Sequence, residues 1–313
     1  MATIGIDIGG SKVLAVRVDD DRVVDRYQGR TPKSGEAPTV AALDATRRVW
    51  SDDVSAVGVG IAGLVRWPEG SFAWGPHVPA TDIPVRSELE AELSVPVVVD
   101  NDANATSWCE MQLGTGVGYR HALVVTLGTG IGGAVVIDGE IYRGGSFAGE
   151  WGHMQYDPGG TLCDCGKRGC WETVASGPAL VRLAKEIIAL NPDSSFAYRL
   201  ADVEITGEAI TAAADSGDEV ARGLVAQVGA EFGRGVASLV AIFDPDVVIV
   251  GGGLGSVGES LVGPARRVVA DALHGGAYRL PPPILVAARG SDAGAEGAAR
   301  MAQDLVDDRI GLE

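Results

Sequence analysis

The hydrophobic pattern of the chain is a series of short β-branched runs, many of which end in glycines. Residues 3–10, TIGIDIGG, are predicted to form a buried strand, and SKVLAVRV directly after them a second strand. After the acidic turn at 19–21, VVDRYQG is predicted to form a third. Apolar runs of this length between turn residues are typical of strands, so the chain should open with a β-meander.

The same pattern returns near residue 122. ALVVTLGTGIGG is a predicted strand with a glycine loop, AVVI continues as the next strand, and EIYRGG follows the turn at 138–139. Gly9-Gly10 and Gly132-Gly133 occupy matching places in the two copies. We interpret this as an internal duplication, with two related domains that each open with a β-meander. Chance similarity of strand–glycine–strand segments is the alternative.

Further strands and helices alternate between and after these copies. VSAVGVGIAG and SVPVVVDND are predicted strands, and the second leads into the helical ANATSWCEMQLG; later helices are GPALVRLAKEIIAL, TGEAITAAADSGD and ARGLVAQVGAEFGRGVASLVAIF. The last of these has one apolar stripe and should end at Asp244-Pro245. DVVIVGGGLGS is a predicted strand–glycine–helix segment, PPILVAARG a last strand, and AGAEGAARMAQDLV a closing helix that returns to the first domain.

Composition and charge exclude several classes of protein. The chain has 313 residues and a net charge of -17, which disfavours nucleic acid and anionic membranes as partners. We find no signal peptide at the N-terminus, and no apolar stretch that reaches the length of a membrane-spanning helix. The chain has four cysteines, three of them clustered, which is unlike a secreted disulfide scaffold. We therefore expect a cytoplasmic enzyme.

Two of the glycine loops join strands. GTGIGG at 128–133 resembles a dinucleotide fingerprint, but that fingerprint must open a helix, and here a β-branched strand follows. Backbone N–H groups at such loops can surround phosphate oxygens, and Asp7 is placed to order the water shell of Mg²⁺. The predicted phosphate-loop residues are Asp7, Gly9, Gly10, Ser11, Lys12, Gly128, Thr129, Gly130, Gly132 and Gly133.

A third glycine cluster, Gly251, Gly252 and Gly253, precedes a helix and could hold the adenosine end of a nucleotide. Each loop alone is a weak signal. Together, in this order, they resemble the phosphate-1, phosphate-2 and adenosine motifs of the actin-like ATPase superfamily. That resemblance implies a two-domain α/β fold of the actin-like ATPase, or ribonuclease-H-like, type, with duplicated mixed sheets and an interdomain cleft.

The expected domains are 1–118 with about 297–313, and 119–296. The GTGVG segment at 114–118 is a plausible crossing between them.

Asp100-Asn101-Asp102 follows a predicted strand, at the edge where open α/β sheets present their chemistry. A carboxylate here can accept the proton of a sugar hydroxyl. The alternative is that Asp102 merely caps the following helix.

The motifs DIGGSK, NDAN, LGTGIGG, AGEWGH, C-x-C-G-x-x-G-C-x-E and FDPDVVIVGGG occur in the order seen in the ROK family of kinases and repressors. The resemblance runs from Thr3 to about residue 300 and is nearest to the bacterial ROK glucokinases. It implies ATP and Mg²⁺ as cofactors, a hexose substrate, and a homodimer or homotetramer. It also implies that Asp102 is the catalytic base, and that the hexose is held by Gly63, Asn101, Asp102, Glu150, His153 and Glu172.

His153, Cys163, Cys165 and Cys170 supply one imidazole and three thiolates, the complement of a closed structural zinc site. Their spacing matches the family. Disulfides are the alternative, but a C-x-C pair is poorly placed to close on itself. Zinc would pin the loop that carries Glu150 and Glu172. Cys109, alone on a helix, is expected to be a core residue.

Departures from the family pattern leave the substrate open. Ser11 and Ala62 replace a usual threonine and proline, and His77 lies in the 75–84 segment where glucokinases carry an asparagine. Mannose or N-acetylmannosamine as substrate, and polyphosphate as donor, are therefore alternatives to glucose and ATP. A ROK repressor is disfavoured, because DIGG begins at residue 7 and leaves no room for a helix-turn-helix.

Overall fold

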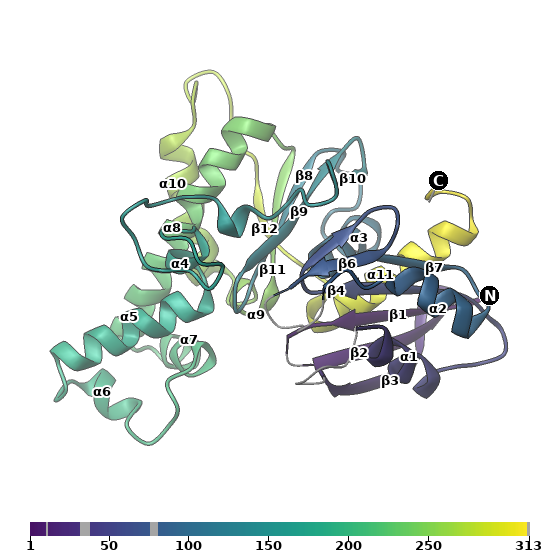
Figure 1. The fold of residues 1–313 in the computed structure, drawn as a ribbon. Coiled ribbons are helices and arrows are strands. Elements are labelled where there is room, and N and C mark those ends of the chain that lie inside the picture. Colours follow the sequence, from purple (N-terminus) through teal and green to yellow (C-terminus); the bar gives the residue numbers. More distant parts are fainter. Residues whose placement is uncertain (11, 32–37, 76–80, 312–313) are drawn as a thin grey trace. The chain divides into compact units, whose positions relative to one another are not determined.

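The protein is described by a computed structural model, which covers residues 1–10, 12–31, 38–75 and 81–311 (Figure 1). Ser11 and His77, both singled out above, lie outside these residues.

Short runs of strands are separated by helices, and a run of consecutive helices spans 172–243. The strands are β1 (Ala2–Ile8), β2 (Lys12–Asp19), β3 (Arg22–Arg30), β4 (Val54–Ile61), β5 (Leu64–Arg66), β6 (Ser71–Trp74), β7 (Val97–Asn101), β8 (Ala122–Leu127), β9 (Ile131–Ile137), β10 (Glu140–Tyr142), β11 (Val247–Gly251) and β12 (Ile284–Val286). The helices are α1 (Pro38–Arg48), α2 (Val85–Leu93), α3 (Asp102–Leu113), α4 (Glu172–Ala175), α5 (Gly177–Leu190), α6 (Ser195–Arg199), α7 (Gly207–Asp215), α8 (Glu219–Phe243), α9 (Gly252–Gly255), α10 (Glu259–Ala272) and α11 (Ala293–Val306), with 3-10 turns η1 (Trp151–His153) and η2 (Gly290–Asp292).

Two five-stranded sheets repeat one topology. Their strand orders are β3-β2-β1-β4-β7 and β10-β9-β8-β11-β12. In both, a strand in the middle pairs in parallel with the fourth strand of its copy, β1 with β4 and β8 with β11. The fourth and fifth strands are parallel too. The internal duplication predicted from the sequence is confirmed by this equivalence, and the fold is a mixed α/β fold with duplicated sheets.

By its contacts the chain divides into two compact units. The first consists of Met1–Gly118, Ala134–Gly149 and Ala288–Glu313, and the second of Tyr119–Gly133 and Glu150–Ala287. The domain boundaries drawn from the sequence remain a prediction. Below, each unit is described by itself.

Helix α11 packs against β1, β4 and α3 in the first unit (Figure 1). A Cβ atom at Gly5 would lie 1.9 Å from the carbonyl oxygen of Ala295, and one at Gly58 would lie 1.8 Å from that of Ala298. Since no side chain fits there, α11 lies directly on the backbone of the sheet. The opposite face of β1, with Ile4, Ile6 and Ile8, belongs to a core cluster that includes residues of α1 and α2.

Helix α8 is the central helix of the second unit and packs against α4, α5, α7 and α10. The expectation that no apolar stretch is long enough to span a membrane is wrong for this helix. It has 25 residues and an 18-residue window of mean hydropathy 1.2, but half of that window is buried inside the protein. A core helix buried by its neighbours explains the same composition, because it needs apolar residues on several faces.

Helix α10 was missed from the sequence. It contains Pro264, and its neighbour Gly263 also disfavours a helix. Packing on α8 overrides these preferences: Cβ atoms at Gly229 and Gly233 would lie 2.3 Å and 2.7 Å from backbone atoms of Leu261 and Ala265. The close approach of the two helices is thus encoded in the glycines of α8 and not within α10. Helices α1, α2 and α6 and the hairpin β5–β6 were also not predicted.

Candidate functional site

The hairpin of β1 and β2 carries the predicted phosphate residues of the first unit. β1 and β2 pair antiparallel, so Gly9 and Gly10 join two strands as predicted. The Gly9 N–H donates to the Lys12 carbonyl at 3.0 Å, and the Thr31 hydroxyl donates to the Gly9 carbonyl at 2.6 Å. The turn is thereby held with Gly10 exposed.

Asp7 lies near the end of β1 in an environment that disfavours its charge. Burial raises the pKa of Asp7 to about 7, and the carboxylate of Asp102 adds to this rise while Lys12 opposes it. A Cβ atom at Gly294, at the start of α11, would lie 2.8 Å from Cγ of Asp7. Gly294, which was not predicted to be a site residue, therefore leaves the space that this carboxylate occupies.

Asp102 is the first residue of α3, but it is not the cap. The N-cap is Asn101, whose Oδ1 accepts from the N–H groups of Ala103 at 2.8 Å and Asn104 at 3.2 Å. Asp102 itself accepts from the adjacent Ala103 N–H at 3.0 Å. Burial raises the pKa of Asp102. The capping alternative is therefore wrong for Asp102, and its carboxylate is left for another use.

Asn101 and Gly63 are linked at the ends of neighbouring parallel strands, β7 and β4. The Asn101 amide Nδ2 donates to the Gly63 carbonyl at 2.9 Å. Gly63 has φ +138°, and a Cβ atom there would lie 2.6 Å from the Trp74 carbonyl oxygen. These two predicted sugar-site residues thus lie beside Asp102 in the first unit.

The second unit contains the other glycine loop, between β8 and β9. It joins two strands, as predicted. A Cβ atom at Gly130 would lie 2.7 Å from Oε2 of Glu172, whereas one at Gly133 would lie 2.2 Å from the Trp151 ring. Nothing lies within 4 Å of a Cβ atom at Gly128. Gly128 is therefore an open position of this loop.

The third glycine cluster follows β11. Gly251 ends the strand, and α9 begins at Gly252, which has φ +80° and backs onto Leu127. A Cβ atom at Gly253 would meet nothing within 4 Å. The predicted strand–glycine–helix arrangement is confirmed, with an open backbone at Gly253.

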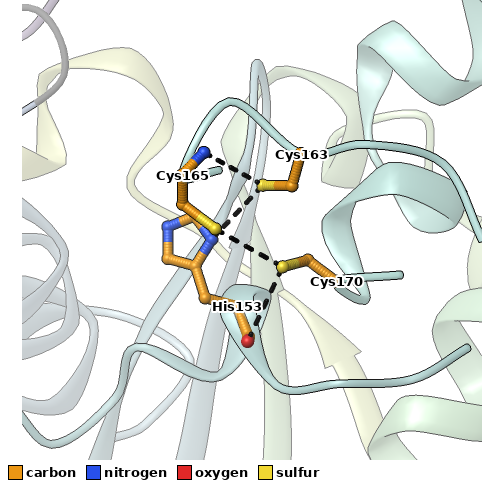
Figure 2. Close-up of side chains that lie close together, drawn as sticks. All are labelled: His153, Cys163, Cys165 and Cys170. Atoms are coloured by element: carbon orange, nitrogen blue, oxygen red, sulfur yellow. Dashed lines mark hydrogen bonds between the residues drawn. The ribbon is translucent and has the colours of Figure 1, made fainter. Parts of the chain in front are cut away.

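Four predicted metal ligands converge in the second unit (Figure 2). The ligand atoms of His153, Cys163, Cys165 and Cys170 all lie within 4.8 Å of one another. Sγ of Cys163 lies 3.7 Å from Nδ1 of His153, and Sγ of Cys165 lies 3.6 Å from Sγ of Cys170. All four cysteines of the chain are free, so the disulfide alternative is not what the structure contains. One imidazole and three sulfurs at such distances suit a tetrahedral zinc ion.

The thiols of this cluster titrate unequally. Burial and a hydrogen bond to Glu172 raise the pKa of Cys163, while the pKa of Cys165 is lowered, because hydrogen bonds from the Lys167 backbone and the neighbouring thiols outweigh its burial. Three thiolates this close repel one another, and a divalent cation removes that repulsion. The donor set therefore fits a structural cation.

Glu172 lies between the cysteine cluster and the glycine loop. Its Oε1 accepts from Sγ of Cys163 at 2.9 Å and lies 3.4 Å from Nδ1 of His153, while its Oε2 accepts from the Ile131 N–H at 3.4 Å. Glu150, the other predicted carboxylate, directly precedes η1 and is exposed. His153 ends η1, so both residues lie on one short turn.

Trp171 anchors this loop, and sequence inspection missed it. Its ring stacks on Phe232 of α8 with centroids 5.7 Å apart, and its Nε1–H donates to the Glu231 carbonyl at 3.1 Å. A Cβ atom at Gly235 would lie 2.0 Å from this ring. Trp171 stands between Cys170 and Glu172, and an aromatic residue directly after a metal ligand was the one available signal.

Comparisons with known proteins agree along the whole chain. The ROK family matches residues 3–305. A glucokinase of Streptomyces coelicolor is 38% identical over 96% of this chain and 98% of its own length, and an N-acetylmannosamine kinase of Vibrio vulnificus is 34% identical over 82% and 84%. This chain is also similar to a ROK family glucokinase from Streptomyces griseus, whose crystal structure was determined in complex with glucose and AMPPNP. The two structures superpose with a TM-score of 0.88 at 38% identity, and the match covers 97% of this chain and 100% of the glucokinase chain. The chain therefore belongs to the ROK family.

Proposed function

We propose that this chain is an ATP-dependent glucokinase, which transfers the terminal phosphoryl group of ATP to D-glucose and releases ADP and D-glucose 6-phosphate. The observation that carries the proposal is the likeness, over nearly the full chain, to a glucokinase whose structure holds both glucose and an ATP analogue. The freedom of Asp102 from capping α3 supports it independently.

Asp102 is the proposed general base. It takes the proton of the hexose hydroxyl as the oxygen attacks the terminal phosphorus. Its environment suits this role, because burial raises its pKa from the ordinary aspartate value toward that of a better proton acceptor.

The hexose is proposed to be held by Gly63, Asn101, Glu150, His153 and Glu172. Carboxylates suit vicinal diols, since each oxygen can accept from a neighbouring hydroxyl. Nδ1 of His153 faces the sulfurs, which leaves Nε2 as the nitrogen that donates to a hydroxyl.

ATP is proposed to lie on the three glycine loops, where Gly9, Gly10, Gly128, Gly130, Gly132, Gly133 and Gly251–Gly253 offer backbone N–H groups and Ser11, Lys12 and Thr129 add donors or charge. Mg²⁺, when bound, neutralises the developing charge on the phosphates. Asp7 is the residue that would order its water shell, since its carboxylate lies at the end of β1 beside the first of these loops.

Zinc is the proposed structural ion, held by His153, Cys163, Cys165 and Cys170. Bound Zn²⁺ supplies cross-linking of the loop and no reaction chemistry. With these ligands fixed, Glu172 and His153 keep their orientation. We place this reaction in the cytoplasm, in a homodimer or homotetramer.

A coupled assay of a hexose panel with ATP and polyphosphate tests the function. We expect ADP release with glucose and ATP to exceed that with mannose or N-acetylmannosamine. The second candidate, an N-acetylmannosamine kinase, is favoured by the 34% identical relative and makes the reverse prediction. No turnover of any hexose with either donor would contradict the kinase proposal itself.

A further inference from the structure

A buried carboxylate stands two residues before the proposed base. The side chain of Asp100 is 2% exposed, at the end of β7. Its Oδ1 accepts from the Asn101 N–H at 2.7 Å and from Nδ2 of Asn104 at 2.8 Å. Asn101 caps α3 and Asn104 lies in its first turn, so Asp100 is bonded to residues on both sides of Asp102.

The remaining oxygen of Asp100 is bound by an arginine distant in sequence. Nε of Arg143, which directly follows β10, donates to Oδ2 of Asp100 at 2.8 Å, and its side chain is 13% exposed. A buried carboxylate without a cationic partner is strongly destabilised, so this ion pair offsets the cost of burying the Asp100 side chain.

Arg143 is itself held on two further sides. Its guanidinium lies 3.8 Å from the centre of the Trp67 ring, and its Nη1 donates to the Ile141 carbonyl at 3.2 Å. The hydroxyl of Ser146 accepts from the Trp67 N–H at 3.1 Å and donates to the Trp67 carbonyl at 3.3 Å. An arginine stacked on a ring and bonded at two nitrogens has little freedom, so it defines a position for Asp100.

We propose that Arg143 is a positioning residue for phosphoryl transfer, which acts through Asp100 to fix the turn at Asn101–Asn104 and hence the direction of the Asp102 carboxylate. The inference rests on the proposed function, because it takes Asp102 as the base. All the residues involved belong to the first unit. Misplacement of a catalytic group by about 1 Å can cost on the order of a hundredfold in rate. Loss of this ion pair can therefore lower the rate strongly although Arg143 does not itself touch the substrate.

The test compares four proteins: wild type, Arg143→Gln, Asp100→Asn and the double variant. Arg143→Gln should lower kcat about tenfold to a hundredfold and change the hexose KM less than about threefold, because the substrate-holding side chains remain. Arg143→Lys should recover part of kcat, since charge is kept but the planar fork is lost. If Arg143 acts through Asp100, the double variant should be no slower than Asp100→Asn alone.

Arg48→Gln is the matched control. Arg48 also lies over an aromatic ring, that of Tyr27 at 5.5 Å, and pairs with Asp44 at 3.8 Å, but on α1. Its kcat should remain within about twofold of wild type, as is usual for exposed ion pairs.

Hydrogen exchange of the peptide that spans 98–108 gives a readout that does not depend on turnover. Arg143→Gln should speed exchange at the capped N–H groups of Ala103 and Asn104, and Arg48→Gln should not. If wild type phosphorylates no hexose while this exchange effect is present, the proposed function fails and the coupling of Arg143 to the turn stands. Unchanged exchange with unchanged kcat in Arg143→Gln, or effects of the two substitutions on kcat that multiply, would overturn the positioning role.

Discussion

The two copies of the duplicated sheet share a strand order but differ in what their loops and strand ends carry. In the first copy, Asp7, Lys12 and Asp102 lie at or near these ends. In the second, residues 122–137 contain no charged side chain, and β11 runs into glycines. One copy therefore offers carboxylates, and the other offers bare backbone N–H groups.

In the second unit, the predicted site residues with ionisable side chains lie elsewhere. Glu150, His153 and Glu172 lie on the segment between β10 and α5, outside the repeated strands. Asp102 is held by a sheet and a helix, whereas these side chains are held by a loop. A loop has few buried contacts of its own, so it needs anchors, and the cysteine cluster and Trp171 provide them. The first copy therefore holds its carboxylates by sheet and helix contacts, whereas the second unit holds them by the cysteine cluster and Trp171.

The largest expected effect concerns Asp102, the carboxylate that is held by a sheet and a helix. Asp102→Asn should lower kcat by about 10²–10⁴-fold and leave the hexose affinity within several-fold, because the amide keeps the size but cannot take a proton. Steady-state kinetics and calorimetric titration with glucose measure the two quantities. Asp218→Asn is the control for the loss of a carboxylate. Asp218 caps α8 through Val220 and Ala221, which asparagine also does, and its ion pair with Arg199 lies in the second unit. Turnover of Asp102→Asn above about a hundredth of wild type would remove it as the base.

The next largest effect concerns the loop that carries the cysteine cluster. Cys165→Ser should lose zinc and raise the hexose KM about tenfold or more, with a smaller change in the ATP constant, because Glu172 and His153 lie at the metal cluster. Metal analysis and kinetics on the two substrates check this. The fold should survive, since Trp171 still binds the loop to α8.

Cys109→Ser provides the control for that experiment. Cys109 is buried in α3 of the first unit, whereas the four cluster residues belong to the second unit. It should keep about one zinc per chain. Active wild-type enzyme without zinc, or a Cys165→Ser enzyme that lacks zinc yet keeps normal hexose affinity, would refute the loop's dependence on metal.

The role of the loop between β8 and β9 in ATP binding can be tested at two of its glycines. Gly128→Ala adds a methyl where nothing lies within 4 Å, so it should weaken ATP binding several-fold without loss of thermal stability. Gly133→Ala should lower the melting temperature by several degrees, because its methyl would overlap the Trp151 ring. Gly130→Val is a poorer probe of ATP alone, since that side chain would also meet Glu172. An ATP constant unchanged in Gly128→Ala would make this loop purely structural.

The last expected effect concerns the pH dependence of stability. Because the pKa of Asp7 is raised to about 7 by burial, the folded state binds a proton between about pH 4 and pH 7 that the unfolded state has lost. The free energy of unfolding should therefore fall as pH rises through this range, by up to about 1.4 kcal/mol per pH unit from this group, and level off above pH 7.

Asp7→Asn should abolish that part of the slope. Urea unfolding at pH 5 and pH 8, without nucleotide or Mg²⁺, measures the difference between the two proteins. Parallel pH profiles for wild type and Asp7→Asn would show that Asp7 titrates normally.

Much of the fold could be predicted because its signals are local. The strands near Asp7 and at 122–137 are β-branched runs between glycines, and α5 and α11 have the apolar spacing of helices. Helix α10 was not predicted, since Gly263 and Pro264 argue against it and the compensating glycines lie on α8. Local preference thus fails where the deciding contact is distant in sequence.

The site divides in the same way. The metal ligands and Asp102 stand in short motifs with a chemical reason for each residue type, so the sequence could propose them. Arg143 and Asp100 are separated by 43 positions, and no motif near either residue indicates that the two are in contact. The ion pair becomes evident only when the fold shows which elements lie side by side.

The packing of α11 has a consequence for the order in which the chain folds during synthesis. Residues 293–306 leave the ribosome long after β1 and β4, yet Gly5 and Gly58 have no side chains of their own and are covered by this helix. Until then, the part of the first sheet around Gly5 and Gly58, with Leu14 and Val16 beside it, lacks its covering helix. The packing of the first unit is therefore completed only after the second unit has been made.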